Sequence, residues 1–203
     1  MVVLRRGENM RMNSQTLLRR LEEMLIEDIP PRVKALRISE PVYCLRLWYY
    51  GTDTVGDRTP SLTLKTEALR QRLLAEKGKQ APHYLWCADE CEEGDGVFRT
   101  PIRNITISHL CRDWFGLLPE GALPDDSELV PLREAIQRVA ASLNRLDWRK
   151  YALVTDDFVV FSADGSHSFC DDYGEMLASV PARKLDRLRS RSLLGTDPWW
   201  ELS

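Results

Sequence analysis

The sequence lacks any long apolar run. No segment approaches the roughly 18 consecutive apolar residues that a membrane-spanning helix needs, and the longest runs, such as 158–161, have the length of a strand. The N-terminus, MVVLRRGENMRMN, has arginines but no apolar segment after them, which is not the pattern of a secretory signal. The 5 cysteines are odd in number and irregularly spaced. These absences predict a cytoplasmic protein with reduced thiols and no membrane partner.

Motifs that bind nucleotides or form a serine nucleophile elbow are also missing. The chain has no G-x-G-x-x-G, no G-x-x-x-x-G-K-[ST] and no G-x-S-x-G. The segment 164–167, Asp-Gly-Ser-His, is expected to be a polar turn. The sequence therefore predicts no cofactor and nominates no catalytic residue. A dispersed Cys, His or Asp site, whose members meet only in the folded chain, stays open.

Charge of one sign is not in excess. The 203 residues include 31 acids and 28 bases, a net charge of -3 at pH 7, whereas a dedicated nucleic-acid binder usually carries a basic excess. Nucleic acid is therefore not the expected partner. The length and the hydrophobic fraction of 43% suit one large domain with a sizeable core. We expect a flexible lead-in over 1–13 and a single domain over 14–203.

Hydrophobic periodicity predicts strands that come in pairs joined by short turns. Helices are expected at 15–28, 66–78, 110–118, 129–146, 172–179 and 182–192. Pro30 and Pro31 should end the first helix, because proline supplies no amide donor. Strands are expected at 42–50, 61–65, 83–89 and 97–107, with a hairpin at 151–163 around Asp156 and Asp157. This order predicts an α+β fold with a mainly antiparallel sheet built from hairpins and helices packed against it.

Five side chains of types that bind zinc are spread over 83–111. They are His83, Cys87, Cys91, His109 and Cys111. In a strand, residues four apart lie roughly 13 Å from one another, too far to share one zinc ion with bonds near 2 Å. If the segment is a helix instead, His83 and Cys87 could bind one ion together, but His83 and Cys91 would still lie roughly 12 Å apart. No Cys-x-x-Cys pair is present. The spacing predicts no metal site and thiols that behave as small buried hydrophobes.

Two charged segments are candidate surfaces. The first is acidic and consists of Asp89, Glu90, Glu92, Glu93 and Asp95. It is either a solvated loop or a docking surface for a basic partner. The second is a basic helical face, consisting of Arg183, Lys184, Arg187 and Arg191. It is either solvated or a contact for an anionic partner such as an RNA backbone.

Tryptophans offer apolar contact area, because they are enriched among binding hot spots. Trp48 and Trp86 lie in expected strands and are candidate partner contacts. Trp199 and Trp200 follow the last helix. At least one of this pair is expected to fold back onto the domain or to anchor an interface.

Three segments carry a family resemblance. The segment 42–74 holds an aromatic-rich strand, a loop, a short strand and then Lys-Thr-Glu-Ala at 65–68. In 81–90, Trp86 comes shortly before acids, and 153–164 has the sequence LVTDDFVVFSAD. This order resembles a family of small bacterial proteins, the domain of unknown function numbered 4303, over most of the chain after residue 15. The resemblance implies an α+β cytoplasmic protein that binds a toxin, in the manner of an immunity protein.

Three functional hypotheses follow from these patterns. The first is a non-enzymatic bacterial binding protein, in its specific form an immunity protein that covers the active site of a cognate toxin. Its acidic loop would supply charge complementarity and Trp48 or Trp86 the apolar contact. The second is a small hydrolase or transferase with a dispersed Cys, His or Asp site. The third is an RNA- or nucleotide-associated module that uses the arginine face.

Overall fold

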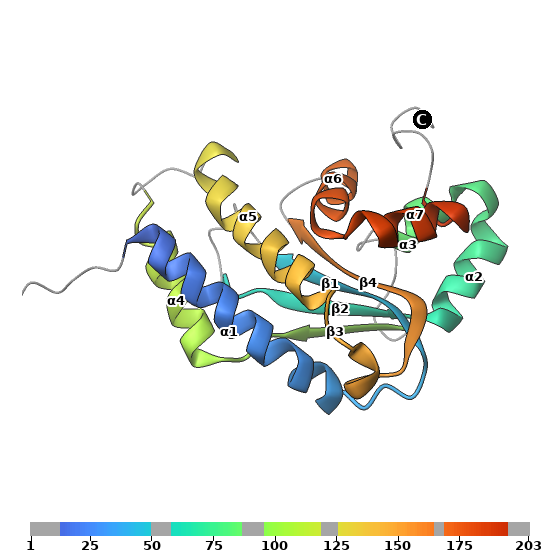
Figure 1. The fold of residues 1–203 in the computed structure, drawn as a ribbon, viewed down its shortest axis with the longest axis horizontal. Helices are drawn as coiled ribbons and strands as arrows, with labels where there is room; N and C mark the ends of the chain where they lie inside the picture. Colours follow the sequence, from blue (N-terminus) through green and yellow to red (C-terminus); the bar gives the residue numbers. More distant parts are fainter. Residues whose placement is uncertain (1–12, 50–57, 87–95, 119–125, 165–168, 195–203) are drawn as a thin grey trace, which may run out of the picture.

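The computed structural model describes residues 13–49, 58–86, 96–118, 126–164 and 169–194 (Figure 1). Its helices are α1 (Ser14–Ala35), α2 (Glu67–Lys77), α3 (Ala81–Trp86), α4 (Ile105–Phe115), α5 (Asp126–Leu143), α6 (Phe169–Ser179) and α7 (Ala182–Ser190). Its strands are β1 (Val42–Tyr49), β2 (Ser61–Thr66), β3 (Val97–Pro101) and β4 (Val154–Asp164). Within these described ranges, no helix has both the length and the apolar character needed to cross a bilayer.

The strands form one mixed sheet in the order β3-β2-β1-β4. The pairs β1–β2 and β2–β3 are antiparallel, whereas β1 and β4 are parallel. The α+β class is confirmed, but the hairpin expected at 151–163 is instead the single strand β4. The chain passes from β3, at one edge of the sheet, through α4 and α5 to β4, at the opposite edge. A long crossover of this kind can place two strands parallel to each other.

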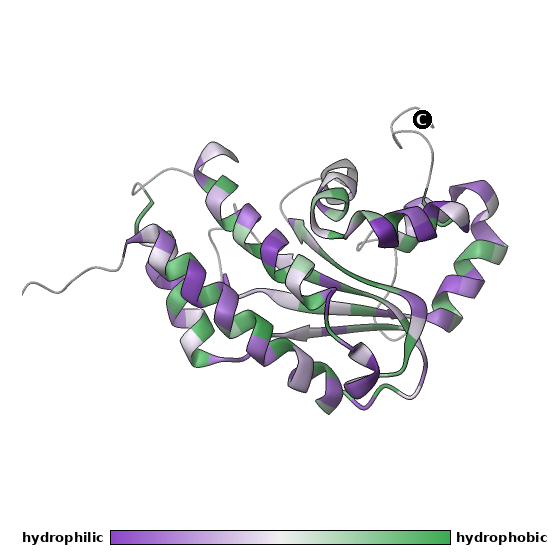
Figure 2. Ribbon diagram, viewed as in Figure 1, coloured by the Kyte–Doolittle hydropathy of each residue, from purple (hydrophilic) through white to green (hydrophobic). Residues whose placement is uncertain are grey.

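Helices cover both faces of the sheet (Figure 1). One hydrophobic cluster joins α1, α4 and α5 to Leu45 and Leu47 of β1. The other joins α2, α3, α6 and α7 to Cys44 of β1 and Phe161 of β4. Figure 2 shows hydrophilic and hydrophobic residues alternating along α1 and α5, as expected for helices with one face in the core.

Three further predicted elements are wrong, in extent or in type, and packing or local helix chemistry explains each. The first helix continues through Pro30 to Ala35, since Ile29, Pro30 and Val33 are buried in the core. The segment expected as a strand at 83–89 instead forms helix α3 over its described part, with Pro82 in the first turn, where proline is tolerated. The strand expected at 97–107 stops at Pro101, and Asn104 caps α4 by accepting a hydrogen bond from the Thr106 backbone N–H at 3.0 Å.

The open edge of β4 is covered by side chains rather than by another strand. Backbone groups of residues 156, 158, 160 and 162 bond to side chains of α6, of α7 and of Asn144, the residue that follows α5. Arg187 donates to the Asp156 carbonyl at 2.6 Å, Lys184 to the Phe158 carbonyl at 2.8 Å, Asn144 to the Val160 carbonyl at 2.6 Å, and the Ser162 N–H donates to Ser179 Oγ at 3.3 Å. An edge satisfied in this way offers no template for pairing with another chain.

Candidate functional site

A hollow of about 660 Å³ opens beside α4. We call it the α4 hollow. Its described lining comprises Arg58, Ile105, Ser108, His109, Arg112, Phe115 and Gly116. All but Arg58 come from α4 and its C-terminal cap, so the hollow lies between one face of this helix and the segment that leads into β2. Its volume lies within the range of pockets that hold small molecules or side chains of a partner.

The amphipathic pattern of α4 determines which side chains line the hollow. Ile107, Leu110 and Trp114 are buried in the core on one side of the helix. Ile105, Ser108, His109, Arg112 and Phe115 recur at intervals of three and four residues and therefore share another face. Ile105 is 74% exposed, the largest exposed fraction among the large apolar side chains of the described residues.

Arg58 lines the hollow opposite α4, and both Arg58 and Thr59 contact this helix. The Arg58 guanidinium carbon lies 4.1 Å from the centroid of the Phe115 ring, a cation–π contact that contributes about 0.5–1 kcal/mol at an exposed site. Thr59 Oγ1 donates to Ser108 Oγ at 2.8 Å. These two contacts join residues about fifty positions apart in the sequence and give the hollow a defined shape.

The hollow carries charge of one sign. Arg58 and Arg112 are cations, His109 contributes an imidazole, and the described lining contains no carboxylate. The nearest acid along α4 is Asp113, whose Oδ1 lies 3.6 Å from Arg112 Nε with both side chains more than half exposed. Such an exposed pair contributes little stability, because water screens it. The α4 hollow is therefore suited to an anionic group accompanied by an apolar one.

A second polar group lies at the carboxyl ends of the parallel strands β1 and β4. Tyr49 and Asp164 end the two strands and pair in register. The Tyr49 hydroxyl donates to Glu175 Oε1 at 2.5 Å, and Arg133 Nε lies 3.4 Å from the same oxygen. Arg133 Nη2 is also 3.9 Å from Asp164 Oδ2. We call these four side chains the strand-end cluster.

Burial determines the protonation of the strand-end cluster. It raises the pKa of Glu175 above its usual value, and the Asp164 charge adds to this effect, although Tyr49 and Arg133 oppose it. Burial, followed by the charge of Glu175, also raises the pKa of Tyr49, so the phenol remains a donor. The cluster thus holds two buried carboxyl groups that compete for one cation, which favours retention of a proton by Glu175.

Replacing Glu175 with glutamine should make stability less dependent on pH. A folded-state pKa above the unfolded one stabilises the protein below the unfolded pKa, and this contribution is lost as pH rises through the folded pKa. Between these two pKa values, the free energy of unfolding of the wild-type protein should therefore fall by up to about 1.4 kcal/mol per pH unit. That of Glu175→Gln should not. Urea unfolding at pH 5, 6, 7 and 8 measures the difference. A difference in unfolding free energy between the two proteins that stays constant from pH 5 to pH 8 would contradict the raised pKa of Glu175.

Most of the residues that the sequence nominated for partner contact lie outside the part of the chain that the structure describes. The acidic segment, Asp89 to Asp95, lies outside the described residues, as do Cys87, Cys91, Trp199 and Trp200. Trp48 is half-buried, with the Arg46 guanidinium carbon 4.9 Å and that of Arg99 5.9 Å from its ring. Its role as a contact residue stays a prediction.

Trp86 does not lie at the surface. Its side chain is 1% exposed, and its indole N–H donates to the Leu193 carbonyl at 2.8 Å. Its ring packs edge-on against Tyr43 and Phe161. In this fold Trp86 is a core residue that joins α3 to the end of α7, because a buried indole finds both apolar neighbours and an acceptor there.

The basic helical face is largely engaged within the protein. Lys184 and Arg187 bond to the edge of β4, and Arg191 Nη1 lies 2.9 Å from Asp157 Oδ2. Burial lowers the pKa of Lys184 to about 8. Arg183 is exposed. Since three of the four cations have structural partners, this face is a poor candidate for an RNA or anion contact.

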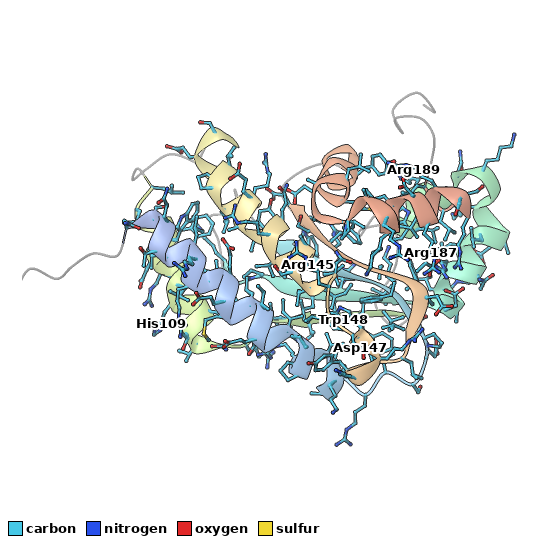
Figure 3. The ribbon with its side chains drawn as sticks, viewed as in Figure 1. His109, Arg145, Asp147, Trp148, Arg187 and Arg189 are labelled. Carbon is cyan, nitrogen blue, oxygen red and sulfur yellow. The ribbon has the colours of Figure 1, made fainter. Side chains whose placement is uncertain are left out.

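The described thiols and imidazoles are spread over the molecule. Cys44 and Cys111 belong to the clusters on opposite faces of the sheet. Burial raises the pKa of the Cys44 thiol to about 11, which disfavours a nucleophilic thiolate. His83 is on α3, and His109 lies on α4 at the end of the molecule opposite Arg187 (Figure 3). Across the described ranges, no three His, Cys, Asp or Glu side chains are placed to hold a metal ion.

Comparison with protein-family models, curated proteins and solved structures finds no match for this chain. The resemblance to the bacterial domain family therefore stays a hypothesis. The α4 hollow and the strand-end cluster are the sites that sequence reasoning missed. For the hollow a signal exists in the helical spacing of Ile105, His109 and Arg112, but it is masked when 97–107 is taken as a strand.

Proposed function

We propose that this chain is a bacterial cytoplasmic protein that acts by binding another protein, and that the α4 hollow is its contact surface. The observation that carries the proposal is Ile105, which is 74% exposed at the rim of a hollow that also contains arginines and an aromatic ring. Exposed apolar side chains beside arginine and aromatic residues are the composition of binding hot spots. The strand-end cluster, by contrast, consists of side chains that contact one another.

The partner class that we propose is a bacterial toxin. This part rests on the resemblance to immunity-like proteins and on the position of the hollow on an outer helix face, where a partner has access. Such a protein would act by covering the active site of the toxin, so its own chain needs no catalytic group. Co-expression with the product of the neighbouring gene, scored as rescue of growth and as a stable purified complex, tests this pairing.

Replacing Ile105 with serine should weaken the complex by at least about tenfold, equivalent to about 1.4 kcal/mol. The side chain is exposed, so the free energy of unfolding should change by no more than about 0.5 kcal/mol. Thr106→Ser is the matched control, because Thr106 is exposed on the same helix and does not line the hollow. Calorimetric titration of both variants with the co-purified partner measures the effect. Equal affinity of Ile105→Ser and the wild-type protein would remove the hollow from the proposal.

A further inference from the structure

The charge and shape of the α4 hollow restrict what it can bind. Its described lining combines Arg58, Arg112 and His109 with Ile105 and Phe115, and contains no acid. Arg112 precedes Phe115 by three residues, so the two share a helix face. The Arg58 guanidinium is held over the same Phe115 ring. Two guanidinium groups are therefore supplied by different segments of the chain near one aromatic ring.

Among the described residues, no carboxylate holds either guanidinium group in a close ion pair. A guanidinium stacked on a ring keeps its N–H donors at its edge, where they can bind a carboxylate in a bidentate manner. Arg112 contacts Asp113 only through a 3.6 Å pair in which Arg112 is 69% exposed. An incoming carboxylate of better geometry can replace this pair at little cost.

The hollow is long enough for a short peptide segment. Ile105 and Phe115 bracket the basic stripe, and ten residues of helix span about 15 Å. An extended chain covers this length with about four or five residues, at about 3.3 Å each. Ile105 would then contact an apolar side chain of the segment, while the arginines contact carboxylates.

We infer that the α4 hollow recognises an acidic segment of its protein partner, with carboxylates bound by Arg58 and Arg112 and an apolar residue bound against Ile105. This inference rests on the proposed function and specifies the partner. It also differs from the expectation that the acidic segment of this chain meets a basic partner, because the described contact surface has the opposite charge.

Two fluorescein-labelled pentapeptides, Glu-Glu-Leu-Glu-Glu and Gln-Gln-Leu-Gln-Gln, probe the hollow in the full-length protein. The glutamate peptide should bind at least tenfold more tightly than the glutamine peptide. Its affinity should fall as NaCl is raised from 50 to 300 mM, since salt screens exposed charges. In two-dimensional NMR, the shifts should concentrate on the residues that line the hollow. Equal binding of the two peptides, or shifts that lie elsewhere, would overturn the inference.

Arg112→Glu should weaken the glutamate peptide at least tenfold, whereas Arg149→Glu should leave its affinity unchanged. Arg149 is a matched control, because it is an exposed arginine outside the hollow and changes net charge by the same amount. Equal affinities of the two variants would also overturn the inference. A further experiment adds 5 mM inorganic phosphate to the complex of the protein with the glutamate peptide. If phosphate displaces the peptide completely, the hollow binds small anions rather than an acidic segment, and the inference fails.

The same variants separate this inference from the proposed function. If Ile105→Ser disrupts the complex with the toxin and Arg112→Glu does not, the hollow binds the partner without recognising its carboxylates. In that case only the inference fails. If the peptide binds as expected but the toxin complex is insensitive to both variants, the acidic-segment chemistry stands and the proposed function fails.

Discussion

Asp157→Ala is expected to lower the free energy of unfolding by about 3 kcal/mol, at the lower end of the cost of breaking a buried ion pair. The Asp157 side chain is 0% exposed, and its Oδ2 accepts from Arg70 Nη1 at 3.0 Å and from Arg191 Nη1 at 2.9 Å. It therefore ties α2 and the end of α7 to β4. Arg70 is 7% exposed and would keep Glu67, at 2.5 Å, and the Tyr43 ring, whose centroid lies 5.1 Å from its guanidinium carbon, which is why the lower end applies.

The neighbouring acid provides the control. Asp156 is exposed, and within the described ranges its carboxylate pairs only with the exposed Arg149, at 2.9 Å. Asp156→Ala should change stability by no more than about 0.5 kcal/mol. Urea unfolding monitored by tryptophan fluorescence compares both variants with the wild-type protein. A loss below 1 kcal/mol for Asp157→Ala would show that the two arginines are satisfied without it.

The contribution of Asp157 to stability depends on pH. Burial by itself would raise the pKa of Asp157, but the Thr155 side chain and the Arg70 and Arg191 guanidinium groups outweigh it, and the pKa lies below its usual value. A lowered folded-state pKa gives stability that is present above the unfolded pKa and is lost as pH falls through the folded one. The stability advantage of wild type over Asp157→Asn should therefore shrink below about pH 4.

Asn144→Ala is expected to lower the free energy of unfolding by about 3–4 kcal/mol, because it leaves several buried polar groups without partners. Asn144 Oδ1 accepts from the Val160 N–H and from Lys184 Nζ, both at 3.0 Å. Its Nδ2 donates to the Val160 carbonyl at 2.6 Å and to the Ala140 carbonyl at 3.0 Å. One side chain thus satisfies both backbone groups of an edge-strand residue and positions a partly buried lysine.

Arg145→Ala is the matched control for this position. Arg145 is the next residue and is exposed, so its loss should be nearly neutral. Hydrogen exchange adds a local measurement, since the Val160 amide should exchange faster in Asn144→Ala even after correction for global stability. Unchanged protection of this amide would contradict the role assigned to Asn144.

Sequence periodicity by itself determined the elements whose apolar residues recur over several turns or strand positions. It predicts α1, β1, β2, α2 and most of α5. These predictions succeed because the hydrophobic pattern acts locally. The α+β class follows from the same local information, because strands and helices do not alternate regularly.

Only the tertiary structure decided the features that depend on contacts between distant segments. Pro30 and Pro31 remain inside α1 because the helix has a core to pack against, and 154–164 forms one strand because β1 supplies a parallel neighbour. Lys184, Arg187 and Arg191 resemble a solvated basic face in sequence, but the fold brings them to the edge of β4 and to Asp157. No local pattern encodes such partners.

The same distinction applies to the sites. The stripe of Ile105, His109 and Arg112 is present in the sequence once 105–115 is known to be a helix, but the contribution of Arg58 depends on a fold contact with Phe115. Tyr49, Asp164 and Glu175 meet only because two strand ends and α6 converge. Local spacing therefore determined the elements of this protein, and long-range packing decided which of its charges became structural and which stay exposed.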